Sequence, residues 1–144
     1  MSIRATYPVI VDYDRDIEKI LRDDAYINFI SDIVLRQIRT KETGTKTIPV
    51  DLFGTKELSS SDGILWSMHA RLRRPLEAIE LLEFGEQHTD VQLLLPVIAL
   101  GSLIDLGPSR HVFGLTSWEE KPALRLFPVS TLWTPEYYFA STRV

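Results

Sequence analysis

The sequence has no cysteine among its 144 residues, which excludes disulfides, thiolate metal ligands and cysteine nucleophiles. It also lacks a long apolar run. The longest, LLLPVIAL, is far shorter than the roughly 20 residues that a membrane-spanning helix needs. The N-terminal stretch has no apolar core of the kind that marks a signal peptide. We therefore expect a cytoplasmic protein.

Positive charge is scarce as well, because 16 Lys and Arg residues face 20 Asp and Glu residues, for a net charge of −4. Proteins that bind nucleic acid generically need a basic face for the phosphates, so generic nucleic-acid binding is not expected. The remaining composition is that of an ordinary globular protein, with 44% hydrophobic and 25% charged residues. The length suits one domain, so we expect residues 1–144 to form a single domain.

Before about residue 90 the apolar residues recur mostly at helical spacing. This spacing predicts helices within 17–40, where a second helix begins at Asp23 or Asp24, and within 64–84. The latter is interrupted at Pro75 by a kink or a junction of two helices, because proline lacks an amide donor. Short strands are predicted at 5–13 and 47–54. We assign one apolar stripe of the second helical segment to the protein core: Leu65, Met68, Leu72, Leu76, Ile79 and Leu82.

After about residue 90 the sequence favours strands. Residues 91–106, 110–118, 123–129 and 136–144 are rich in β-branched, aromatic and leucine residues, and polar turns separate them. Residues 119–122, EEKP, favour a hairpin turn. The sequence therefore predicts an α+β fold, in which N-terminal helices pack on one face of a mostly antiparallel sheet formed largely by the C-terminal half.

Residues 9–16, VIVDYDRD, place three carboxylates, those of Asp12, Asp14 and Asp16, at the end of a predicted strand. This stretch resembles the first motif of the haloacid dehalogenase superfamily, which implies a nucleophile at Asp12 and a general acid at Asp14 beside magnesium. The resemblance covers these residues alone, and the later motifs of that superfamily are not found. The interpretation we favour is that Asp12 or Asp14 caps a helix whose first turn holds Asp16 and Glu18.

A second catalytic candidate is the set Asp105, Glu119 and Lys121, which has the composition that metal-dependent nucleases use to hold magnesium and activate water. Pro122 follows directly, so we favour a solvated hairpin tip instead. The three histidines, His69, His88 and His111, stand too far apart for a short zinc-binding pair. We therefore predict no metal site and no cofactor.

The most unusual charge pattern begins at His69, where Arg71, Arg73 and Arg74 precede five acidic residues with no intervening Lys or Arg. Arginines can bind phosphate or an acidic protein face through planar, bidentate donors. They also stabilise the C-terminal end of a helix, which is the alternative. In the aromatic C-terminal segment, strand alternation turns Tyr138 away from its neighbours, and an exposed Tyr138 would favour association.

From these patterns we expect a small interaction or regulatory protein that binds a protein partner or itself, as a homo-oligomer, rather than a catalyst. The predicted partner- or anion-binding residues are His69, Arg71, Arg73, Arg74 and Tyr138. Two alternatives stay open. One is a magnesium-dependent phosphoryl-transfer enzyme or nuclease using the carboxylates above, and the other is a domain that binds a small ligand in a pocket between helices and sheet.

Overall fold

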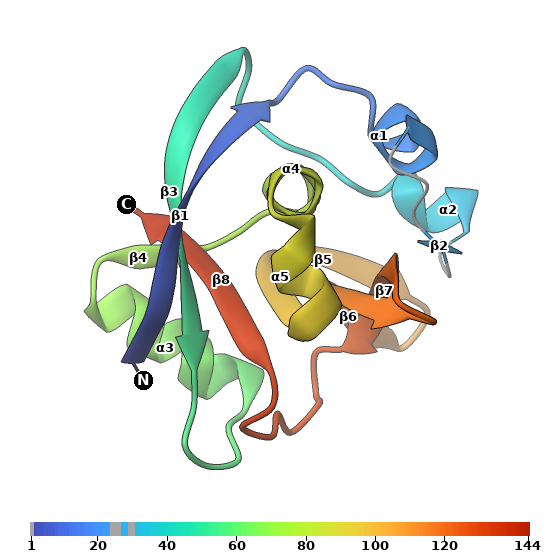
Figure 1. Cartoon of the computed structure of the whole chain (residues 1–144). Coiled ribbons are helices and arrows are strands. Elements are labelled where there is room, and N and C mark those ends of the chain that lie inside the picture. The colour runs from blue at the N-terminus through green and yellow to red at the C-terminus, as the bar shows by residue number, and fades with distance from the viewer. Residues whose placement is uncertain (1, 24–26, 29–30) are drawn as a thin grey trace.

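The computed structural model describes residues 2–23, 27–28 and 31–144 (Figure 1). The strands are β1 (Ser2–Asp12), β2 (Ile27–Asn28), β3 (Thr45–Gly54), β4 (Arg73–Pro75), β5 (Val97–Leu106), β6 (Ser109–Trp118), β7 (Lys121–Pro128) and β8 (Tyr138–Arg143). The helices are α1 (Ile17–Asp23), α2 (Asp32–Leu35), α3 (Ser61–Ala70), α4 (Ala78–Gln87) and α5 (Thr89–Leu94). The predicted α+β class is confirmed. None of the described helices is long and apolar enough to cross a membrane.

The described strands form one sheet in the order β1-β3-β8-β5-β6-β7-β2, and β4 pairs with β8 beside this path. Most neighbours are antiparallel, as predicted; β5 with β8 and β2 with β7 are parallel. The sheet curls around α4, which lies between the β1 and β3 end and the β6 and β7 end (Figure 1). Strands β1 and β3, from the N-terminal half of the chain, and strands β6 and β7, from the C-terminal half, thus lie on opposite sides of α4.

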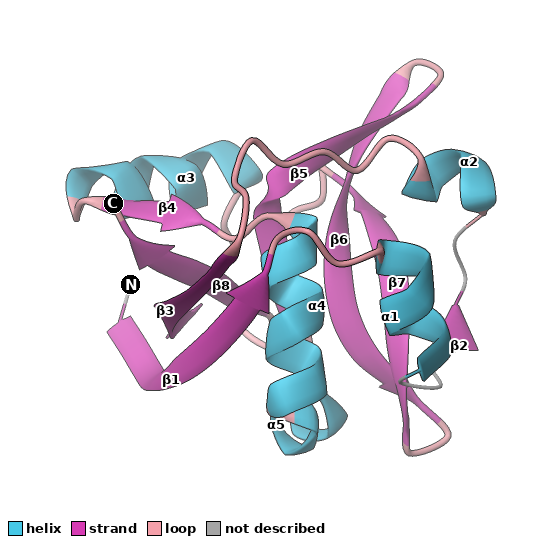
Figure 2. Ribbon diagram, turned by 90° about the horizontal axis from the view of Figure 1, so that it is seen from above, coloured by secondary structure: helices cyan, strands magenta, loops and turns pink. Residues whose placement is uncertain are grey.

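Alternation along the strands divides the core between two faces of the sheet. On one face Leu52 and Val97 pack in a cluster with the buried residues of α4. On the other, Phe53 and Ile98 pack with Ile64 of α3. Figure 2 shows α3 and α4 on different sides of β3 and β8. The expectation that the helices lie on one face is therefore not confirmed.

The helical segment predicted over 64–84 is interrupted, as expected, but by a strand rather than by a kink or a direct junction of two helices at Pro75. α3 ends at Ala70, β4 contains Pro75, and α4 begins at Ala78. Local signals fix both helix starts. Ser60 caps α3 by accepting a hydrogen bond from the amide of Gly63, and Glu77 and Glu80 form a capping box on α4. The strand β4 lies between these two helices in the chain and contains Arg73 and Arg74, two of the arginines predicted to bind a partner.

Other predicted boundaries are corrected. Residues 91–94 were expected in a strand but belong to α5, because a short apolar run such as VQLL fits either a buried strand or a helix. A second helix was expected to begin at Asp23 or Asp24, but α1 ends at Asp23, residues 27–28 form the strand β2, and α2 begins only at Asp32. Part of that prediction, at 24–26 and 29–30, lies outside the described residues.

Side chains from α4 and from His88, which follows it, cover the outer edge of β1 along residues 8–12. The Gln87 side-chain amide accepts from the Ile10 N–H at 2.9 Å and donates to the Ile10 carbonyl at 2.7 Å. Glu83 accepts from the Asp12 N–H at 3.2 Å, and His88 contacts the Pro8 carbonyl at 2.9 Å. These side chains take the place of a neighbouring strand along residues 8–12, so this part of the edge is not open to pairing with another chain.

Candidate functional site

The aspartates of residues 9–16 close local turns. The Asp14 N–H donates to the Asp12 carboxylate at 3.1 Å, and the Gly44 N–H donates to the Asp14 carboxylate at 3.0 Å. Asp16 accepts from the Glu18 N–H at 3.0 Å just before α1, so the carboxylate at the helix start is Asp16 rather than Asp12 or Asp14. Among the described residues, no group of three or more His, Asp or Glu side chains could hold a metal ion.

The nuclease-like set is not brought together. Asp105 pairs with Arg110 at one end of β6, whereas Glu119 and Lys121 follow its other end. At about 3.4 Å per residue, the intervening strand separates them by roughly 27 Å. The hairpin predicted at residues 119–122 is confirmed, because Trp118 pairs with Lys121 and both turn residues have positive φ.

Arg73 points inward from β4. It forms an ion pair with the fully buried carboxylate of Asp51, which also accepts a hydrogen bond from the Thr6 hydroxyl. The Arg73 guanidinium lies 5.5 Å from the centre of the Phe53 ring. Burial, and then the nearby charge of Arg143, lower the pKa of Arg73. This arginine therefore links β4 to β3 beneath α3.

Arg74 projects from the opposite face of β4 and also forms an ion pair with a buried carboxylate, that of Glu80. Its guanidinium donates to both carboxylate oxygens of the fully buried Glu80, at 2.9 and 2.7 Å. Glu80 further accepts from the Tyr13 hydroxyl at 2.7 Å and from the Glu77 N–H at 2.8 Å. Burial tends to raise the pKa of Glu80, but these hydrogen bonds outweigh it and the pKa is lowered.

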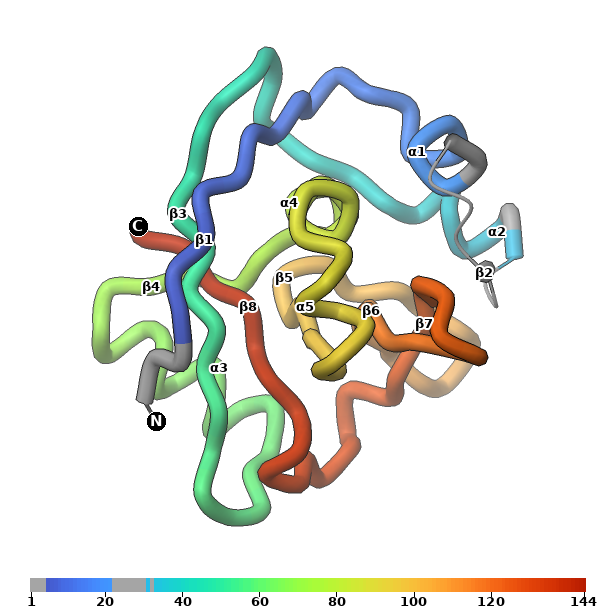
Figure 3. The backbone as a smooth tube through the Cα atoms, viewed as in Figure 1, coloured from blue at the N-terminus to red at the C-terminus, as the bar shows by residue number. Residues whose placement is uncertain are grey.

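The C-terminal end of α3 carries exposed apolar and basic side chains. Trp66 is 73% exposed and Leu72 is 75% exposed, and His69 and Arg71 are exposed beside them. Arg143 of β8 lies opposite Arg73 of β4, where the C-terminal end of β8 runs beside β4 (Figure 3). We call Trp66, His69, Arg71, Leu72 and Arg143 the α3 corner.

Leu72 has an unfavourable backbone conformation in the α3 corner. Its φ is 58°, in the left-handed region, immediately after the C-terminal cap of α3 at Arg71. Glycine is the usual residue at such a position, because a side chain there is strained. The assignment of Leu72 to the core stripe is wrong: helical spacing no longer applies after Ala70, and the side chain turns to solvent.

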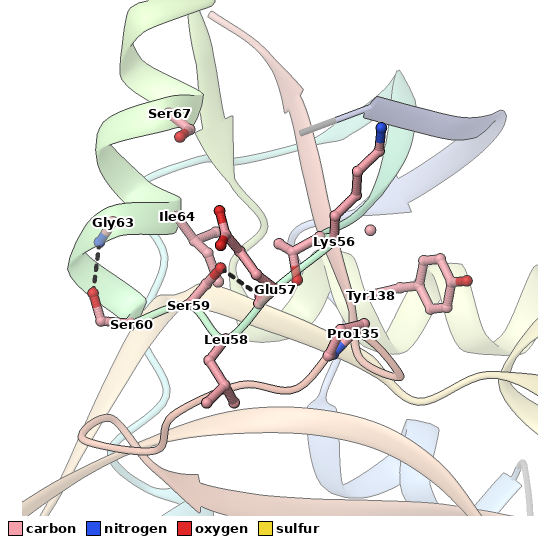
Figure 4. Close-up of a pocket in the computed structure, with 12 residues that line it drawn as sticks. Lys56, Glu57, Leu58, Ser59, Ser60, Gly63, Ile64, Ser67, Pro135 and Tyr138 are labelled. Carbon is pink, nitrogen blue, oxygen red and sulfur yellow. Dashed lines mark hydrogen bonds between the residues drawn. The ribbon is translucent and has the colours of Figure 1, made fainter.

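A groove of about 930 Å³ runs between α3 and the loop that follows β3 (Figure 4). Ser60, Gly63 and Ser67 line its α3 wall, and Tyr138 lines the side away from α3. Figure 4 shows the Glu57 side chain projecting toward α3, whereas the Lys56 side chain projects away from it. The groove therefore contains hydroxyl groups and one inward carboxylate.

The structure thus separates the residues predicted to bind a partner. His69 and Arg71 lie in the α3 corner, Tyr138 lines the groove, and Arg73 and Arg74 contact buried carboxylates. The sequence interpretation missed Trp66 and Glu57. Trp66 had a usable signal, because it lies about 160° around the helix from the buried Met68, at 100° per residue. Nothing local to the sequence marks Glu57.

Comparison with known proteins gives no guide to function, since no family model, no curated protein and no solved structure matches the chain.

Proposed function

We propose that this protein acts by binding a partner protein at the α3 corner, and that the bound segment carries apolar and acidic side chains. The observation that carries the proposal is Leu72, a strained residue whose large apolar side chain is 75% exposed. A non-glycine residue in the left-handed region costs roughly 1–2 kcal/mol, and no burial of the leucine compensates for it. Strain of this kind is concentrated at binding sites.

Trp66 supports the same surface. Tryptophan is enriched among the residues that dominate binding energy at protein interfaces, because it buries a large area with few rotatable bonds. At 73% exposure, most of that area is still available to a partner. Isolated exposed apolar residues are ordinary, but here a tryptophan in the second half of α3 and a leucine two residues after the helix are both exposed.

The positive charge of the α3 corner favours an acidic partner. Arg143 stands opposite Arg73 in the antiparallel pair of β4 and β8, and like charges in that position repel. Asp51 neutralises Arg73, but within the described part of the chain Arg143 has no ion-pair partner. A carboxylate from a bound segment would supply one, through the bidentate geometry that arginine favours.

A selection of random dodecapeptides displayed on phage, with the purified protein immobilised, tests the proposal. We expect enriched peptides to combine acidic with aromatic or aliphatic residues. Their affinity, measured by fluorescence anisotropy, should fall at least about tenfold in Trp66→Ser and in Leu72→Asn. The matched control is Leu94→Asn, which changes a leucine that is 81% exposed on α5 and should leave affinity unchanged.

Two results would overturn the proposal. One is a selection that enriches no peptide, or enriches peptides whose affinity the α3 corner variants do not alter. The other is self-association, measured by sedimentation velocity, that Trp66→Ser abolishes; the partner would then be a second copy of the chain rather than an acidic segment.

A further inference from the structure

We infer that the groove and the α3 corner form one continuous site for an extended segment, with a basic side chain at Glu57 and an acidic side chain about five residues away at Arg71 and Arg143. This inference rests on the proposed function, since it specifies the segment that the α3 corner binds. It adds a second contact point, Glu57, and a predicted separation between the basic and the acidic residue of the bound segment.

The groove follows the axis of α3 toward the α3 corner. Ser60, Gly63 and Ser67 recur every three or four residues, which places them along one side of the helix. Arg71 comes one turn after Ser67 and caps the helix. From Ser60 to Arg71 the helix advances about 16 Å at 1.5 Å per residue. An extended chain covers that length with about five residues.

The groove has room for the side chains of a bound segment. Its volume of about 930 Å³ is near the upper limit of ordinary ligand pockets. The small residues on its α3 wall leave this space open. At Gly63, an added Cβ would meet only the Ser60 hydroxyl, at 3.3 Å, so larger side chains on this wall would fill the groove rather than strain the sheet.

The charge of the groove favours a cation. Glu57 projects across it toward α3, while Lys56 projects away (Figure 4). Asp62, in the first turn of α3, adds a second negative charge at the same end. The Glu57 carboxylate can accept hydrogen bonds from a lysine ammonium or an arginine guanidinium. A carboxylate at this end would meet repulsion, so the acidic side chain belongs at the α3 corner.

The test uses the peptides enriched on the full-length protein in the selection above. We expect them to carry a Lys or Arg about five positions from an Asp or Glu. Glu57→Lys should weaken their binding at least about tenfold, and Ser67→Trp should do the same by filling the groove. The matched controls are Glu120→Lys, in the turn between β6 and β7, and Ser109→Trp, at the start of β6, which make the same changes at exposed positions elsewhere. They should leave affinity unchanged.

The outcomes separate this inference from the proposed function. If the peptides respond to Trp66→Ser but not to Glu57→Lys or Ser67→Trp, the single continuous site is refuted and the α3 corner stands alone. If Glu57→Lys weakens binding but replacing the basic residue of the peptide by Ala does not, the predicted ion pair is refuted. Thermal unfolding of each variant, compared with its control, shows whether a loss of binding is a loss of folding. A folded Ser67→Trp variant with unchanged affinity refutes the groove as the binding path.

Discussion

Replacing Leu72 by glycine should stabilise the protein, although the substitution removes a large side chain. Leu72 has a φ of 58° and is 75% exposed, so the variant relieves backbone strain and loses little packing. The strain of a non-glycine residue in this region is roughly 1–2 kcal/mol. Glycine has more conformational freedom in the unfolded chain, which offsets about 0.4–1 kcal/mol of that gain.

The net effect on the free energy of unfolding should therefore be an increase of about 0.5–1 kcal/mol. For a chain of this size, that corresponds to a rise in Tm of about 2–4 °C. Differential scanning calorimetry can measure this rise. The matched control is Leu58→Gly, because Leu58 is 63% exposed but has no positive φ. Leu58→Gly should leave Tm unchanged or lower it.

The same variant separates stability from function. If Leu72 is kept for binding, Leu72→Gly should bind the selected peptides at least about tenfold more weakly while it unfolds at a higher temperature. A fall in Tm would refute the argument from backbone strain. A higher Tm with unchanged peptide affinity would refute the argument that the strained leucine serves binding.

Three further predictions concern stability. Gln87→Ala should lower the free energy of unfolding by about 1–3 kcal/mol, because it removes the side chain that hydrogen-bonds the Ile10 N–H and carbonyl. The exposed strand edge should also increase light scattering on storage. Scattering equal to that of the unmodified protein would contradict the proposed role of Gln87 in covering this edge. Arg73→Ala should cost about 3–5 kcal/mol by leaving Asp51 buried without its partner, whereas Arg143→Ala should change stability by less than about 0.5 kcal/mol in urea unfolding. The pKa of Glu80 is lowered in the folded protein, so its contribution is fully present above the unfolded value of about 4.3 and is lost as the pH falls through the lower folded pKa. Glu80→Gln should therefore flatten the acid side of the stability profile, and an unchanged profile would contradict this assignment.

The parts of the fold that follow from local chemistry were predictable. Pro75 had to interrupt a helix, and Ser60 lies in a serine-rich loop suited to cap one. The hairpin at residues 119–122 also follows from its turn residues. The placement of α3 and α4 on opposite faces did not follow, because it depends on which face of the sheet each helix meets, and the apolar residues of a helix do not specify that face.

The candidate site was predictable only in part, for a different reason. Leu72 fits the helical repeat that includes Met68 and Leu76, and that repeat ends because the helix itself ends at Ala70. A hydrophobic pattern gives no warning of a residue that adopts a left-handed conformation. Glu57 lies in a loop without periodicity, so only the three-dimensional path of that loop brings it to α3.

The arginines show that a run of like charges in the sequence need not form one charged surface in the folded protein. In the sequence, Arg73 and Arg74 are neighbours with the same charge, and a helical interpretation treats them as one cationic surface. In β4 they point to opposite faces of the strand. One meets Asp51 of β3 and the other meets Glu80 of α4, partners that no spacing in the sequence indicates. Because the charges of Arg73 and Arg74 are neutralised by buried carboxylates, the arginines of the α3 corner are Arg71, beside Leu72, and Arg143 of β8. A binding surface drawn from the charge run alone would therefore omit Arg143, the cation that the β4 and β8 pairing brings to the α3 corner.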